Sequence, residues 1–111
     1  MEKYIWVTNQ KEILHGYKDA PDEVSFLRNQ HRHILHIKTY LAVSHEDRDK
    51  EFIMVKRFIQ SILDDMGMCI KNMSCEMVSN YLYDNIIKKY PDTKVKIEVS
   101  EDKENGSLYE Y

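Results

Sequence analysis

Apolar and polar side chains alternate along several stretches of the chain, which is typical of half-buried β-strands. Residues 3–8 are rich in β-forming side chains and predict a strand, and residues 12–15 predict a second, short one. Residues 31–43 alternate over most of their length and predict a third strand. Near the end of the chain, a final strand is predicted by the alternation of Val95, Ile97 and Val99 with charged residues.

The spacing of apolar residues changes to a helical one between the third and the final strand. Apolar side chains in residues 50–66 recur at three- and four-residue intervals, and Gly67 fits the end of that helix. Ser74 is a suitable N-cap for a second helix, which Pro91 closes. Two consecutive helices can lie on one face of an antiparallel sheet, so the pattern predicts a single α+β domain over residues 1–111.

The composition is typical of a globular protein and argues against several other classes. The chain has 111 residues, of which 42% are hydrophobic and 32% are charged, and this suffices for a core without disulfides. No apolar run approaches the roughly 20 residues of a membrane span, and no signal-peptide hydrophobic region follows the first residues. With only Cys69 and Cys75, we expect reduced thiols and a cytoplasmic location. The net charge of −3 and the acidic residues of 98–111 argue against a nucleic-acid partner.

The most specific chemical pattern is the pair His31 and His33 at the start of the third predicted strand. Successive strand residues point to opposite faces, so these two side chains share one face, about 7 Å apart along the strand. Two such imidazoles can bind one divalent metal if a third ligand arrives from elsewhere. His15 is the best third ligand, because it ends an adjacent predicted strand. The alternative is that strand histidines are simply polar and partly exposed.

Three further residues are candidates for chemistry, each with a plainer alternative. Cys75 lies at a helix start, where the helix dipole would lower the pKa of its thiol, but such a cysteine is more often a small buried residue. Glu101 could accept two parallel N–H bonds from an aminopyrimidine edge, although a solvated acidic turn is the commoner explanation. His36 lies on the strand face opposite His31 and His33, so it cannot bind the same ion without a bulge.

Three segments, in this order, resemble one known family. HRHILHIKTYLAV is similar to the HGHNYxVxVxV strand of 6-pyruvoyltetrahydropterin synthase and of its bacterial relative 6-carboxytetrahydropterin synthase. Residues 74–82, SCEMVSNYL, are similar to that family's T-x-E-x-L-x-x-Y-L helix start, and residues 96–101, KIEVSE, to its closing V-x-V-x-E segment. The resemblance covers roughly residues 26–111.

The resemblance implies a tunnelling fold, in which a four-stranded antiparallel sheet carries two helices on one face and subunits close a β-barrel. It further implies sites that lie between subunits and bind a pterin; we expect a homo-oligomer, a trimer or hexamer, whose ligand is a pterin or a purine nucleotide. The family's zinc ligands match His31 and His33, with His15 as the first ligand. Its ligand-anchoring glutamate matches Glu101, and Glu76 falls on its helix glutamate.

The chain also departs from the family pattern. Leu27 stands where the family has its nucleophilic cysteine, and no histidine occurs near Met66, where the family has an Asp-His pair. A divergent protein that binds a pterin- or purine-like ligand beside a zinc ion is therefore the leading hypothesis. Two alternatives stay open. One is a protein that sequesters a purine-nucleotide signal; the other is an active lyase in which the missing groups are replaced by Cys75, by His36, or by His45 with Asp47.

Overall fold

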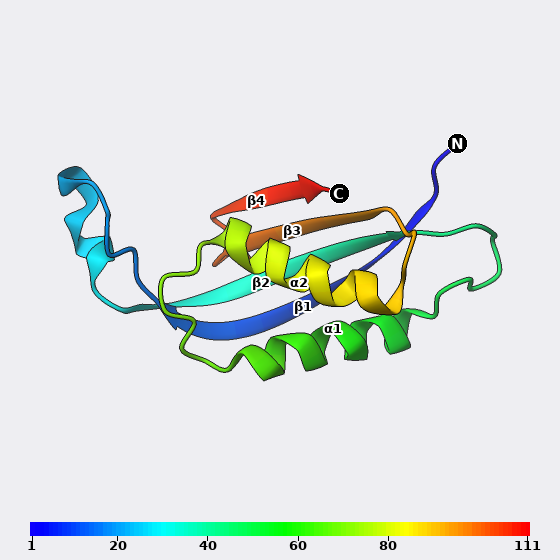
Figure 1. Cartoon of the computed structure of the whole chain (residues 1–111), viewed down its shortest axis with the longest axis horizontal. Coiled ribbons are helices and arrows are strands. Elements are labelled where there is room, and N and C mark those ends of the chain that lie inside the picture. Colours follow the sequence, from blue (N-terminus) through cyan, green and yellow to red (C-terminus); the bar gives the residue numbers. More distant parts are fainter.

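A four-stranded antiparallel sheet, with its strands side by side in chain order, is the centre of the computed structural model, which describes residues 1–111 (Figure 1). Its strands are β1 (Tyr4–His15), β2 (His31–Ala42), β3 (Val95–Glu101) and β4 (Asn105–Glu110). The helices are η1, a 3₁₀ element (Asp22–Arg28), and the α-helices α1 (Phe52–Met66) and α2 (Cys75–Lys89). The predicted α+β class and four-stranded antiparallel sheet are confirmed.

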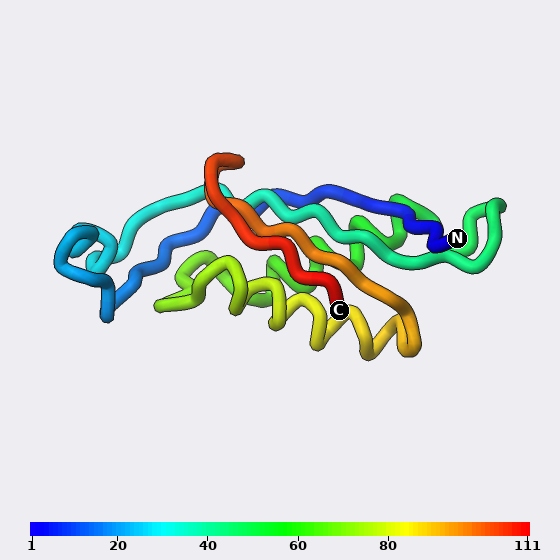
Figure 2. Tube along the Cα trace, turned by 90° about the horizontal axis from the view of Figure 1, so that it is seen from above, coloured from blue at the N-terminus to red at the C-terminus, as the bar shows by residue number.

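Both α-helices cover the same face of the sheet (Figure 2). The apolar stripes of α1 and α2 pack on the inward-facing side chains of the sheet, and the fully buried residues include Ile13, Leu35, Ile59, Leu82 and Ile97. The helix ends lie where the sequence predicted them. Ser74 accepts a hydrogen bond from the Met77 N–H at 3.2 Å as the N-cap of α2, and Gly67 follows α1 with a φ of 75°.

The sheet differs from the prediction in two places. Residues 3–8 and 12–15 belong to one continuous strand, β1, which pairs with β2 along its whole length. The acidic stretch after β3 contains a further strand, β4, which the sequence pattern did not predict. The strand was not predicted because of the residues in the β3–β4 turn. Its central residues Asp102 and Lys103 adopt positive φ values of 55° and 61°, whereas Asn and Gly are the residues that usually occupy these two positions.

The connection between β1 and β2 forms an arm that extends beyond the helices and carries η1 (Figure 1). The molecule is elongated, with extents of 50 × 26 × 22 Å. At the base of this arm, β1 ends at His15 and β2 begins at His31, so the chain leaves and re-enters the sheet at one point. No helix has the length and apolar character that crossing a membrane would require.

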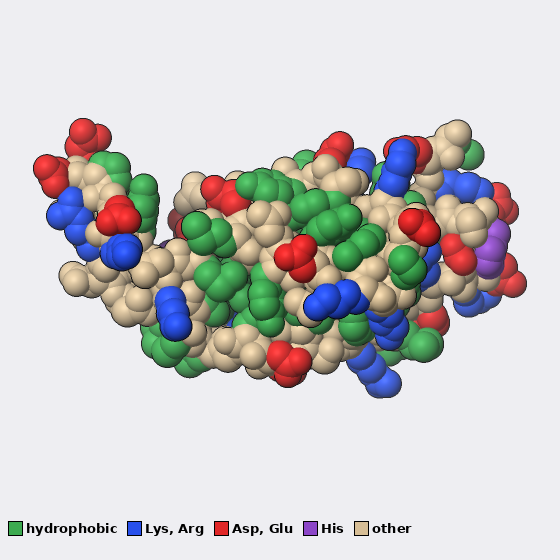
Figure 3. Space-filling model, viewed as in Figure 1, with side chains coloured by type: hydrophobic (Ala, Val, Ile, Leu, Met, Phe, Trp, Pro, Cys, Tyr) green, Lys and Arg blue, Asp and Glu red, His purple; other side chains and the backbone are tan.

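Hydrophobic side chains also gather on the outer surface of the helices (Figure 3). Met54 on α1 is 64% exposed and Met77 on α2 is 55% exposed, and Tyr81 lies one turn beyond Met77. Met54 is in the first turn of α1 and Met77 in the first turn of α2, and because the two helices run in opposite directions, these side chains lie at opposite ends of the helix layer (Figure 1).

Truncation of a core side chain tests the packing. We expect Leu82→Ala to lower the free energy of unfolding by about 2–5 kcal/mol, because Leu82 is fully buried between the helices and the sheet. Leu108→Ala removes the same atoms from a half-exposed position on β4 and should cost no more than about 1 kcal/mol. Urea unfolding of both variants checks this, and equal losses would contradict the placement of the core.

Candidate metal centre

The structure brings the three predicted metal-binding histidines together. The register of β1 and β2 pairs His15 directly with His31, and His33 lies two residues further on the same face. This is the helix-covered face, at the end of the sheet where the apolar core stops. One nitrogen of each ring lies within 4.8 Å of the corresponding nitrogens of the other two, and the ring centroids are 4.7–5.1 Å apart.

Each imidazole is held in place by a hydrogen bond from its Nδ1 atom. Two of the acceptors are backbone carbonyl oxygens and the third is a carboxylate, so Nδ1 is the donor in every ring, and the lone pair of a neutral ring is then on Nε2. The three bonds are His15 to the Met73 oxygen (2.8 Å), His31 to the Asn29 oxygen (2.8 Å) and His33 to Asp102 Oδ2 (2.7 Å). Metal-binding histidines in proteins are oriented in this way.

The partner of His15 comes from the loop between α1 and α2. This loop lies beside the end of β1, where the Leu14 N–H donates to the Met68 oxygen at 2.9 Å and the Gly16 N–H donates to the Lys71 oxygen at 2.8 Å. The loop is thereby fixed against the sheet, and the Met73 carbonyl reaches the imidazole.

The partner of His33 comes from the β3–β4 turn. The Asp102 N–H donates to the Ile34 oxygen at 2.8 Å, and Asp102 Oδ1 accepts from the Ile34 N–H at 2.9 Å, which joins the turn to β2. The hydrogen bonds from His33 and from the Ile34 backbone hold the pKa of the Asp102 carboxyl below its ordinary value. Asp102 was not among the predicted site residues; the available signal was a second carboxylate directly after Glu101.

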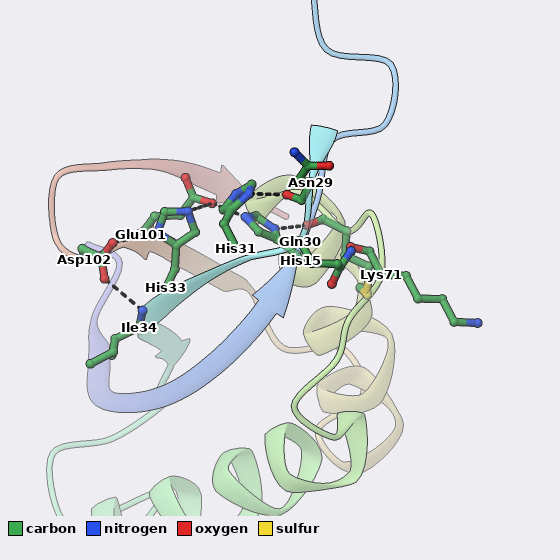
Figure 4. Close-up of polar contacts among 10 residues, drawn as sticks. His15, Asn29, Gln30, His31, His33, Ile34, Lys71, Glu101 and Asp102 are labelled. Carbon is green, nitrogen blue, oxygen red and sulfur yellow. Dashed lines mark hydrogen bonds and ion pairs between the residues drawn. The ribbon is translucent and has the colours of Figure 1, made fainter. Parts of the chain in front are cut away.

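Glu101 points toward the histidines rather than standing free in a solvated turn (Figure 4). Its Oε2 atom lies 2.9 Å from His15 Nε2 and 3.6 Å from His33 Nε2. Because the Nδ1 atom of His15 carries a hydrogen, Nε2 of the neutral ring would be an acceptor, as Oε2 is. Two acceptors at this distance need a proton or a metal ion between them.

A cavity of about 540 Å³ adjoins the histidines. Its wall contains His15 and His31 from the cluster, Glu101 from β3, and Cys75 and Glu76 from the first turn of α2. Glu76 is exposed, whereas Glu101 is partly covered. Leu27 also lines this cavity. Two of the three predicted metal ligands, His15 and His31, and both predicted ligand-binding glutamates therefore border one space.

The predicted low pKa of Cys75 is wrong. The thiol is buried, and burial raises its pKa to about 12, with the nearby Glu101 and Glu76 carboxylates acting in the same direction. The helix dipole that the sequence analysis invoked is outweighed by these effects. Cys75 is in the wall of the cavity, but as a neutral thiol at physiological pH.

The other predicted catalytic groups lie away from the cavity. His36 pairs with Gln10 and Ser100 and faces the side of the sheet that the helices leave uncovered. His45 lies in the loop between β2 and α1, where its Nε2 is 3.5 Å from Asp49 Oδ1.

Alkylation distinguishes the two cysteines. We expect iodoacetamide at pH 8 to label the exposed Cys69 and to leave Cys75 unmodified, because burial and the raised pKa both suppress the Cys75 thiolate. Peptide mass spectrometry measures the labelling, with protein unfolded in urea as the control in which both thiols react. Labelling of Cys75 in the folded protein as fast as Cys69 would contradict this assignment.

No protein-family model matches the chain, and no curated protein matches it either.

Proposed function

We propose that the protein binds a zinc ion through His15, His31 and His33 and holds a pterin- or purine-like ligand in the adjoining cavity. The observation that carries this proposal is the convergence of one nitrogen atom from each of three imidazole rings, each of which is also held by a hydrogen bond through Nδ1. Zinc binds imidazole nitrogen at about 2.0–2.1 Å, and tetrahedral geometry then separates the ligand atoms by about 3.3 Å. Small side-chain movements bring nitrogens that lie within 4.8 Å of one another to this separation.

The donor set favours zinc over the hard cations. Magnesium and calcium prefer oxygen ligands, whereas three imidazoles suit zinc and its transition-metal neighbours. The hydrogen bonds to Nδ1 of the three rings support metal binding further, since they leave the Nε2 lone pairs free for the ion.

The cavity supports a ligand with adjacent N–H donors. Its volume of about 540 Å³ falls within the range of small-molecule sites, about 300–1,000 Å³. Glu76 and Glu101 place carboxylates in its wall, and a carboxylate pairs well with two parallel N–H groups. Pterins and guanine present such an edge, which agrees with the ligand class that the sequence resemblance implies.

Binding without turnover is supported better than lyase activity. Leu27 brings an apolar side chain to the wall of the cavity, and the Cys75 thiol, with its pKa of about 12, is no ready acid or base near pH 7. His36 and His45 face other parts of the molecule. The same features favour a protein that sequesters a purine-nucleotide signal, because this task needs affinity and no chemical step.

We also propose that subunits associate through the sheet edges and close a β-barrel, as a trimer or hexamer with the tunnelling fold. β1 and β4 are the edges of the sheet, and unpaired strand edges tend to be covered or paired. The half-exposed Trp6 on β1 and Leu108 on β4 would gain cover from such pairing.

Metal analysis tests the centre. We expect about one zinc ion per chain in the wild type and a loss of most of it in the double variant His31→Ala/His33→Ala. His36→Ala is the matched control, since it removes an imidazole from the same strand on the opposite face and should leave the zinc content unchanged. Inductively coupled plasma mass spectrometry gives the metal content. Equally low zinc in all three proteins would refute the metal site.

Native mass spectrometry tests the ligand and the assembly together. For protein purified from cells, we expect a trimer or hexamer of the 13.3 kDa chain with a pterin- or purine-sized molecule bound to it. Release of that molecule under denaturing conditions, followed by fragmentation, identifies it. A bare monomer that also fails to bind added pterins and guanine nucleotides would count against both the cavity and the barrel.

A further inference from the structure

Glu101 has the geometry of a metal ligand. Its Oε2 atom is 2.9 Å from His15 Nε2 and 3.6 Å from His33 Nε2, and these distances lie on either side of the roughly 3.3 Å expected between neighbouring ligands of tetrahedral zinc. The glutamate ends β3 on the helix-covered face, which the histidines share, so its backbone position already directs the side chain to the cluster.

The surroundings of Glu101 supply no other partner for its charge. Its ion-pair contacts within the chain are with the two imidazole nitrogens, and no lysine or arginine pairs with it. The side chain is about three-quarters covered, so a carboxylate there lacks part of its hydration. A divalent cation between the carboxylate and the imidazole lone pairs satisfies all of these groups at once.

We infer that Glu101 is the fourth protein ligand and closes a three-histidine, one-glutamate coordination sphere. This inference rests on the proposed function, because it takes the three histidines as the metal site. It assigns Glu101 to the metal, where the sequence resemblance implies an anchor for the organic ligand. Glu76, which is exposed and lies in the wall of the cavity, is then the carboxylate that receives the ligand's N–H groups.

A closed coordination sphere changes the role of the metal. Zinc with four protein ligands is the structural type, whereas catalytic zinc keeps one position for water or substrate. The ion would fasten β1, β2 and β3 to one another where the sheet emerges from under the helices. It would shape the end of the cavity without activating water or the bound ligand.

Cobalt substitution tests this arrangement without any assay of activity. The protein is loaded with Co²⁺, and its visible absorption is recorded before and after azide is added. We expect the wild-type spectrum to be unchanged by azide, since no position is open. Glu101→Ala should open one coordination position on the metal, so that its spectrum shifts on addition of azide.

Zinc affinity, measured by competition with a chromogenic chelator, is the second readout. We expect Glu101→Ala to weaken zinc binding at least about tenfold. Glu104→Ala, a truncation of an exposed glutamate in the same turn, is the matched control and should bind zinc as the wild type does.

The outcomes separate the two proposals. An azide-induced shift in wild-type protein, or unchanged zinc affinity in Glu101→Ala, overturns the fourth ligand and leaves the three-histidine site standing. Failure of the wild type to bind either metal overturns both. The wild-type azide experiment needs no variant, so it decides the question even if Glu101→Ala does not fold.

Discussion

The pairing of His15 with His31 across β1 and β2 is the constraint on which the candidate site depends. Side chains alternate between the two faces of a sheet, so a register shift of one residue would send one of these rings to the opposite side. The register is held by the core, because Ile13 and Leu35 must face the helices in the same strands. Apolar burial in the middle of the sheet thus fixes the position of polar groups at its end.

The histidines lie where the apolar core gives way to solvent. His15 is nearly buried, while His31 and His33 are partly exposed, so the cluster closes the core at this end. A buried ring N–H without a hydrogen-bond acceptor lowers the stability of the fold. Here each ring donates to an acceptor, and the three acceptors come from three separate loops. Those loops are the base of the arm, the α1–α2 connection and the β3–β4 turn.

Much of this site could be predicted from the sequence, because it depends on local periodicity. The alternation of apolar and polar residues after His31 predicted that His31 and His33 share one face of the sheet. The predicted strand that ends at His15 identified the third imidazole. The capping residue Ser74 and the terminating Gly67 fixed the helix ends for equally local reasons.

What escaped prediction depends on tertiary context. The β3–β4 turn uses Asp102 and Lys103 in a conformation that short sequence signals assign to Asn and Gly, so β4 went unrecognised. The pKa of Cys75 depends on its burial and on Glu101, which is remote in sequence. The contact between His33 and Asp102 spans 69 positions, and no spacing rule foresees it.

The β3–β4 turn also limits how this sequence can vary. Asp102 adopts a positive φ and at the same time accepts hydrogen bonds from a ring and a backbone amide. Glycine would suit the backbone and lose the acceptor, while glutamate would keep the charge and strain the turn. Gly106 is similarly confined, since a Cβ there would collide with the Val99 carbonyl oxygen. Homologous chains that preserve this geometry should therefore keep aspartate, or at most asparagine, and glycine four residues apart, a signature by which distant relatives could be recognised.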